Sequence, residues 1–349
     1  MPPVLSLDPP EVLDEAPGLP AVSAPVACSR TVARHGDFEL VTLGSPDGLE
    51  ASFAPRVGMT CCSLRYAGEE LLGERFGLAA YASCGISMGL SLMHPWTNRL
   101  SAWRYTAGGT TVRLPVSPLL HTDRWGLPVN GVQSSGHAWR VEDSGADARS
   151  AWLEATLPFD RDRRQLALFP FPHRLHLRID VAGRALSVAT EIEATGRVPV
   201  PVCFGYRVYL RRDPAVCAVA LPRRQQLLTD QRLIPTGVTE PRAPRTCRLD
   251  RGEVQEVFAL GSDRRVAVIS DTRRLTLESL AGFPLAQVRT HADEPHVTLE
   301  AMTAEPDALS RDSFPVATPG RPYSAALRIA VDAPAPPISA AGPPAKVFA

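Results

Sequence analysis

The short run Leu92–Leu100, LMHPWTNRL, holds the residues of this chain that are best suited to bind a ligand. It places an aromatic ring (Trp96), an amide (Asn98) and a guanidinium (Arg99) close together. Amide and guanidinium groups offer fixed planar donors for hydroxyl-rich or anionic ligands. Because Pro95 cannot donate a ladder hydrogen bond, we expect the run at a strand edge or in a loop. The alternative interpretation is a capped turn with a surface arginine.

Composition limits the classes of partner. The chain has 349 residues, with 37 Lys+Arg and 37 Asp+Glu, so no broad field attracts nucleic acid or an acidic membrane. No apolar run reaches the roughly 18 residues that a membrane helix needs, and the first residues lack the basic and apolar regions of a secretory signal. We therefore expect a cytoplasmic protein, a monomer or homodimer, with a small-molecule ligand and no nucleic-acid or membrane partner.

The cysteines indicate neither a disulfide framework nor a metal site. Their number is odd and no C-x-x-C pair occurs, which favours buried reduced thiols. We expect no metal and no cofactor. The seven are Cys28, Cys61, Cys62, Cys84, Cys203, Cys217 and Cys247.

The elements that must position these residues are strands. The chain has 34 prolines, 25 glycines and few long amphipathic runs. Residues 38–43 and 49–53 flank the turn sequence SPDG, and residues 173–181 and 186–192 alternate in polarity. Many short strands predict an all-β sandwich or barrel. We expect one domain over residues 28–332, between Pro/Ala-rich tails at 1–27 and 333–349.

Seven segments, in order, resemble motifs of the aldose 1-epimerase (galactose mutarotase) family over about residues 38–331. The resemblance implies a large, twisted antiparallel β-sandwich with a sugar site in an open groove on one sheet. The segments are VGMTCCSLRYAGEELL, HPWTNRLSAWRYTAGG, TDRWGLPVNGVQSSGHAWRV, PVCFGYRVYL, LIPTG, VTLEAMTAEPDAL and TPGRPYSAALRIAV.

Mutarotation opens and recloses a sugar ring, and it needs a general base and a general acid that titrate near the working pH. The resemblance implies that the base is a glutamate after P-G. It implies that the acid is the histidine of G-x-H-P-Y, assisted by the histidine of H-G. The arginine of N-R and a mid-chain aspartate hold sugar hydroxyls, and this chain keeps Asn98 and Arg99. The aspartate position falls near Gln255 or Glu256, and the sequence leaves open which of the two faces the groove.

All three proton-handling positions are substituted in this chain. Asn130 stands for the H-G histidine, Arg207 for the acid and Arg321 for the base. An amide does not titrate, and arginine stays protonated because its pKa exceeds about 12. We therefore predict a carbohydrate-binding protein with little or no conventional mutarotase activity, a possible pseudoenzyme.

Two other functions stay open. If Arg99, Arg207 and Arg321 point into one groove, they suit an anionic sugar such as a phosphate or uronate, or another metabolite. An enzyme of altered chemistry then needs a relocated proton carrier, for which His94 and Glu300 are candidates. The other function is a scaffold or sensor whose groove binds nothing.

Each of these candidates also has a simpler explanation. His94, which precedes a proline, can cap a loop, and Glu300 can hold loop backbone. Trp96 can offer a stacking platform for a sugar or fill the core of the sandwich. Whether the protein is an enzyme is therefore left open by the sequence.

Overall fold

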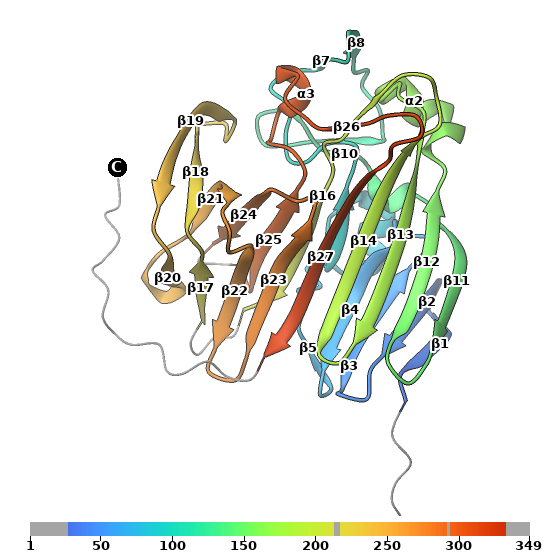
Figure 1. Ribbon diagram of the computed structural model, residues 1–349, viewed down its shortest axis with the longest axis vertical. Coiled ribbons are helices and arrows are strands. Elements are labelled where there is room, and N and C mark those ends of the chain that lie inside the picture. The colour runs from blue at the N-terminus through green and yellow to red at the C-terminus, as the bar shows by residue number, and fades with distance from the viewer. Residues whose placement is uncertain (1–26, 213–216, 292–293, 333–349) are drawn as a thin grey trace, which may run out of the picture.

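The computed structural model describes residues 27–212, 217–291 and 294–332. Within them, two large antiparallel sheets pack face to face (Figure 1). This arrangement confirms the all-β sandwich that the strand pattern predicts. The expected tails fall outside the described residues, apart from residue 27.

The larger sheet has twelve strands, and β5 (Glu69–Glu70) pairs only with β4 at its side. Its remaining strands follow in spatial order: β1 (Ser29–His35), β2 (Phe38–Gly44), β3 (Leu49–Ala54), β4 (Thr60–Tyr66), β6 (Leu90–Met93), β16 (Gly205–Arg211), β25 (His296–Met302), β24 (Leu285–Thr290), β21 (Gln255–Leu260), β18 (Arg224–Thr229) and β19 (Pro235–Arg242).

The smaller sheet has nine strands, in the order β11 (Arg140–Ala146), β12 (Ala151–Leu157), β13 (His173–Ala182), β14 (Ala185–Ala194), β27 (Tyr323–Asp332), β23 (Arg274–Ala281), β22 (Arg265–Ser270), β17 (Cys217–Leu221) and β20 (Arg245–Arg248). Three two-stranded pairs complete the fold: β9 (Leu120–Thr122) with β10 (Pro128–Val132), β7 (Arg104–Ala107) with β8 (Thr110–Arg113), and β15 (Val200–Pro201) with β26 (Val316–Ala317).

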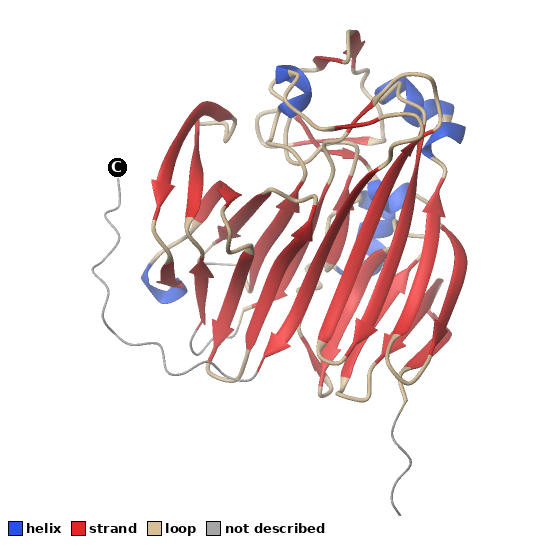
Figure 2. Cartoon of the chain, viewed as in Figure 1, coloured by secondary structure: helices blue, strands red, loops and turns tan. Residues whose placement is uncertain are grey.

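Helices are short and few among the described residues (Figure 2). None of them is long and apolar enough to cross a membrane. They are α1 (Gly77–Cys84), α2 (Arg163–Leu168), α3 (Ala308–Arg311) and the 3-10 helices η1 (Ser134–Gly136), η2 (Phe159–Arg161) and η3 (Leu249–Arg251).

Alternating burial explains why these sequences form strands. In β13 and β14 every second residue is buried, as the polarity pattern predicts. The predicted hairpin around SPDG also forms, since β2 and β3 pair and the Ser45 amide donates to the Leu49 carbonyl. Most of the buried apolar side chains of the described residues join into one cluster that runs from Cys28 to Val331 between the sheets, and two small clusters lie apart from it.

The same alternation gives the larger sheet a second face that does not contact the smaller sheet. In β16, Val208 and Leu210 belong to the core between the sheets. Arg207 and Tyr209, at the alternate positions, therefore project from the opposite face. We call this the groove face, because the loops around β10 and the β18–β19 hairpin border it.

The cysteine prediction is confirmed in part. Five of the seven cysteines are buried. Cys84 is exposed at the end of α1, and Cys247 is half-buried in β20. The prediction of buried thiols is therefore wrong for Cys84, because α1 lies on the surface and buries only Tyr81.

Candidate functional site

Arg207, Glu300 and Gln287 stand in one row on the groove face. The strand register places Arg207 of β16 opposite Glu300 of β25, and Glu300 opposite Gln287 of β24. Directly opposed residues share a face of the sheet, so their side chains meet. The Arg207 Nε lies 2.6 Å from Glu300 Oε1, and both side chains are largely buried.

Two asparagines from loops complete this row. The Asn98 amide donates to Glu300 Oε2 at 2.8 Å and to Gln287 Oε1 at 3.1 Å. Arg207 Nη2 donates to Asn130 Oδ1 at 3.2 Å and to Asn98 Oδ1 at 3.4 Å. We call these five residues (Asn98, Asn130, Arg207, Gln287 and Glu300) the polar network. It joins predicted sugar-binding residues and the candidate Glu300 in one connected group.

The two loops are held in an unusual backbone conformation. Asn98 and Asn130 have φ values of +51° and +63°, in the left-handed region that asparagine tolerates better than most residues. The backbone N–H of Asn130 donates to the backbone carbonyl of Asn98 at 2.6 Å. The next residue, Gly131, has φ +77°, and a Cβ there would lie 2.2 Å from the His94 carbonyl oxygen. The close approach therefore requires glycine at position 131, and the left-handed conformation favours asparagine at position 130.

The charges of the network are fixed. Burial works to lower the pKa of the Arg207 guanidinium, but Glu300 and the Tyr209 hydroxyl raise it above its ordinary value. Arg207 therefore stays charged, and both oxygens of Glu300 are engaged, one by Arg207 and one by Asn98. The other three side chains, Asn98, Asn130 and Gln287, are amides and do not titrate. The network therefore offers amide and guanidinium donors and amide and carboxylate acceptors, which suit hydroxyls or an anion.

Arg99 faces a different wall of the groove. Its Nε lies 2.7 Å from Asp123 Oδ2, and its guanidinium lies 5.0 Å from the centre of the Trp125 ring. Burial works to raise the pKa of Asp123, but hydrogen bonds from Arg99 and from the amides of Leu127 and Trp125 lower it. The arginine is thus fixed by a carboxylate and a ring before any ligand arrives.

Two cavities flank the polar network. One, of about 410 Å³, is bordered by Asn130, Arg207 and Asp123. The other, of about 300 Å³, is bordered by Arg99, Gln287 and residues of β18 and β21. Both volumes are in the range of small-ligand sites, roughly 300–1,000 Å³.

Gln255 and Glu256 both border the smaller cavity, but their side chains face differently. The Glu256 carboxylate is ion-paired with the buried Arg224, at 2.7 Å, and with Arg245. The Arg224 guanidinium lies 5.6 Å from the ring of Phe258, a core residue. Glu256 therefore faces the interior, and alternation along β21 leaves Gln255 on the groove face. No carboxylate is available from this strand to hold a sugar hydroxyl.

His94 and Trp96 point away from the groove. The His94 Nε2 lies 2.9 Å from the Nε2 of His173, and its ring packs edge-on against Phe159. Trp96 is fully buried and packs against Tyr105. The expectation of a proton carrier at His94 or a stacking platform at Trp96 does not match this placement, because both rings belong to the core.

Arg321 is also outside the polar network. It closes a turn in which the amides and carbonyls of Thr318 and Arg321 exchange hydrogen bonds, and its side chain is exposed. It borders neither cavity beside the network. The three arginines that were expected to converge therefore do not: Arg207 lies in the network, Arg99 on a separate wall, and Arg321 in a turn that borders neither cavity. Glu300 is the carboxylate of the polar network.

Sequence reasoning missed Gln287 and Asp123. Gln287 lies outside the seven family-like segments, and it reaches Asn98 only because the register of β24 and β25 sets it opposite Glu300. Asp123 lies within the segment TDRWGLPVNGVQSSGHAWRV, but the resemblance implied no role for it. Asp123 had a local signal, since an aspartate before a glycine-containing turn accepts from amides that follow it, here those of Trp125 and Leu127. Within the described ranges, no group of three or more His, Cys, Asp or Glu side chains is placed to hold a metal ion.

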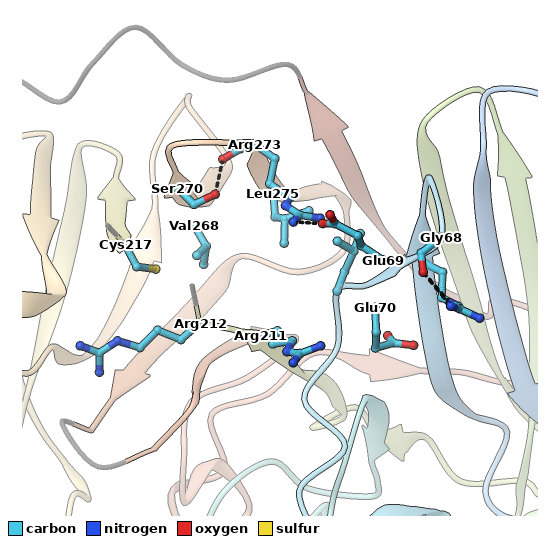
Figure 3. A pocket seen from close by; sticks show the side chains of 12 residues that line it. Gly68, Glu69, Glu70, Arg211, Arg212, Cys217, Val268, Ser270, Arg273 and Leu275 are labelled. Carbon is cyan, nitrogen blue, oxygen red and sulfur yellow. Dashed lines mark hydrogen bonds and ion pairs between the residues drawn. The ribbon is translucent and has the colours of Figure 1, made fainter. Parts of the chain in front are cut away.

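A larger cavity of about 510 Å³ lies elsewhere, between the β4–β5 turn, the end of β16 and the strands β22 and β23 (Figure 3). Its two carboxylates are already engaged. Glu69 pairs with Arg273, and Glu70 accepts hydrogen bonds from Ser63 and from the amides of Leu64 and Leu72. These contacts stabilise the turn, so we place the candidate site at the polar network instead.

The fold is shared with solved structures of low sequence identity. A galactose mutarotase-like protein from Clostridium acetobutylicum is 15% identical, with a TM-score of 0.75, and the match covers 88% of this chain and 99% of that one. Galactose 1-epimerase from Lactobacillus acidophilus is 16% identical, with a TM-score of 0.69, over 88% and 99% of the chains. A protein of Synechocystis sp. PCC 6803 is 17% identical, with a TM-score of 0.68, over 88% and 97%.

Sequence comparison is more specific about ancestry. No curated protein sequence matches the chain at a significant level. The aldose 1-epimerase family profile, however, matches residues 39–328, which is most of the chain and includes every residue of the polar network. The chain belongs to the aldose 1-epimerase family.

Proposed function

We propose that this protein binds a carbohydrate over the polar network and does not catalyse mutarotation by the conventional acid–base route. The observation that carries the proposal is the Arg207–Glu300 pair, which occupies the row where the resemblance expects a titratable acid. Asn98, Asn130 and Gln287 add amide groups suited to sugar hydroxyls. Family membership supports a carbohydrate as the ligand class. Cytoplasmic location and a monomeric or homodimeric state remain predictions from the sequence.

Titration calorimetry with glucose and galactose tests the binding. We expect measurable affinity in the wild type and a loss of about tenfold in Asn98→Ala, because that change removes one side chain's hydrogen bonds to the row. Arg104→Ala is the control, since this arginine is exposed on β7. Equal affinity in all three proteins, or a groove that binds no sugar of any kind, would contradict the proposal and favour a scaffold that binds nothing.

An enzyme of altered chemistry is the second candidate. It is favoured by the placement of Glu300, the carboxylate of the polar network, beside a guanidinium that can bind an anionic sugar. Glu300→Gln should then abolish turnover of a phosphorylated or uronic sugar while leaving its binding measurable. Turnover that survives in Glu300→Gln would remove this candidate.

A further inference from the structure

The cavity of about 410 Å³ beside the polar network has features that the network itself does not use. Strand register places Tyr209, Thr298 and Arg289 in a second row on the groove face. This row is offset by two residues from Arg207, Glu300 and Gln287, or about 7 Å along the strands. Tyr209 and Arg289 border the cavity, together with Arg75 from the loop after β5.

The positive charges of this cavity exceed its negative charges. Among the described residues, Arg75 makes no ion pair, and its guanidinium lies 5.0 Å from the centre of the Tyr209 ring. Arg289 has one ion-pair contact, at 3.8 Å from Glu294. The bordering carboxylate, Asp123, is already paired with Arg99. A ligand in this cavity therefore meets two guanidiniums whose charge is poorly balanced.

Two polar groups along the cavity lack a partner in the described part of the chain. The hydroxyl of Tyr81, a residue only 2% exposed, has no hydrogen-bond partner there, and neither has Nε2 of His121. Burial raises the pKa of Tyr81 and lowers the pKa of His121. Near neutral pH, Tyr81 is therefore a hydrogen-bond donor and His121 is uncharged. Buried polar groups are normally satisfied, so these two suit a bound ligand.

We propose that this cavity is a subsite for the oxyanion group of a sugar ligand, a phosphate or a carboxylate, with Arg75, Arg289, Tyr81 and Tyr209 as its donors. The inference rests on the proposed function, because it places the sugar ring over the polar network and the oxyanion over the adjacent row. Arg75 and Arg289 flank the cavity from a loop and from β24, and long arginine side chains can converge on one anion. The ligand class is thus a sugar carrying its charge about one ring width from the network.

Titration calorimetry of the full chain with glucose, glucose 6-phosphate, glucuronate and inorganic phosphate tests this assignment. We expect a charged sugar to bind at least about tenfold more tightly than glucose, and the difference to shrink as salt is raised. The phosphorylated and carboxylated sugars separate the two sources of oxyanion. Inorganic phosphate reports whether the subsite binds the group alone.

Variants locate the effect. Arg289→Gln and Tyr81→Phe should each reduce the preference for the charged sugar while leaving glucose affinity unchanged. Arg75→Gln should also reduce the preference for the charged sugar. Because Arg75 donates a hydrogen bond to the Ser87 carbonyl at 2.9 Å, this variant could also disturb the loop, and the other two variants test the subsite independently of that contact. Arg211→Gln is the matched control, because Arg211 lies on the same strand as Arg207 but borders the larger cavity.

The two proposals fail differently. If glucose binds as tightly as both charged sugars and the three cavity variants change nothing, the subsite is wrong and carbohydrate binding stands. If the preference for charge is lost in Arg211→Gln instead, the oxyanion binds in the larger cavity and the assignment is also overturned. If no sugar of either kind binds, the proposed function falls with it.

Discussion

Two groups of polar side chains lie on either side of one loop, residues 94–100, and they differ in their surroundings: one is buried in the core and the other faces the groove. His94, His137 and His173, which we call the histidine cluster, are buried in the core among phenylalanine rings. The polar network, which begins at Asn98, faces the groove. The cluster consists of imidazoles, which ordinarily titrate near neutral pH, but they are buried in the core, whereas the network lies beside two cavities and contains no histidine.

The difference has a physical cause. Burial lowers the pKa of His137 and of His173 to about 4, and burial with the neighbouring His173 and His137 lowers that of His94 well below its ordinary value. These rings are therefore neutral and pack as aromatic side chains. In the network, Arg207 forms an ion pair with Glu300 at 2.6 Å. The polar network thus contains no histidine, although His94 precedes Asn98 by only four residues in the sequence.

The largest expected effect is the loss of the charge pair in the network. Glu300→Ala leaves the Arg207 guanidinium buried without its carboxylate, and the free energy of unfolding should fall by about 3–5 kcal/mol. Urea denaturation measures the change. Replacing both residues, as Arg207→Met with Glu300→Met, should recover most of the loss, because no unpaired charge remains.

A surface pair supplies the control for that experiment. Asp263 and Arg265 form an ion pair at 2.8 Å with both side chains about half exposed. Asp263→Ala should cost less than about 1 kcal/mol. Equal losses in Glu300→Ala and Asp263→Ala would mean that the network is no more tightly coupled than a surface contact.

The histidine cluster should show itself in the pH dependence of stability. His137 binds its proton near pH 4 in the folded chain but near 6.5 when unfolded, so the unfolded state takes up more protons in between. Stability is therefore complete above about pH 6.5 and falls as the pH drops toward 4, by up to about 3 kcal/mol for this residue. The nearby carboxylates work against these shifts: Asp162 raises the pKa of His137, and Asp160 raises the pKa of His173. Neither carboxylate therefore increases the loss of stability at low pH.

His137→Phe tests that slope. The variant should lose less stability than the wild type between pH 6.5 and 4 in urea denaturation. His35→Phe is the control, because His35 is exposed on β1 and its removal should leave the slope as it is. A wild-type slope that His137→Phe does not reduce would show that the cluster is not the source.

The smallest effect concerns the backbone where the two groups meet. Gly131 and Gly109 both have φ +77°, but only at Gly131 would a Cβ collide with backbone, 2.2 Å from the His94 carbonyl oxygen. Both alanine variants carry the strain of a left-handed residue. Gly131→Ala should cost about 1–3 kcal/mol more than Gly109→Ala in thermal or urea unfolding. Equal costs would mean that the loop relaxes freely around Asn130.

The strands could be predicted from the sequence because alternation is a local property. Burial in β13 follows it residue by residue. The left-handed positions of Asn98 and Asn130 also suit their residue type. The direction of each side chain along residues 94–100 was out of reach, since it depends on a loop held by β10 and by Asp307, which accepts from the Ser101 amide.

Site residues could be predicted from the sequence only where they lie in a segment that resembles a family motif. Arg207 was found through its motif. Its contact with Glu300, and through Glu300 with Gln287, depends on the pairing of strands about 90 residues apart in the sequence. Arg75, Tyr81 and Arg289 come from three separate segments that carry no shared pattern. Arg321 was expected beside Arg99 and Arg207 because a motif aligned there, but it lies in a turn that borders neither cavity beside the network.

Polarimetry on freshly dissolved α-glucose and α-galactose tests the central claim most directly, with the wild type compared with an Asn130→His, Arg207→His double variant. We predict that the wild type leaves the rate of mutarotation at the buffer value. The double variant should raise it, because it returns titratable groups beside Glu300. Acceleration by the wild type well above buffer would contradict the account, since it would show that the Arg207–Glu300 pair itself supports the proton transfers.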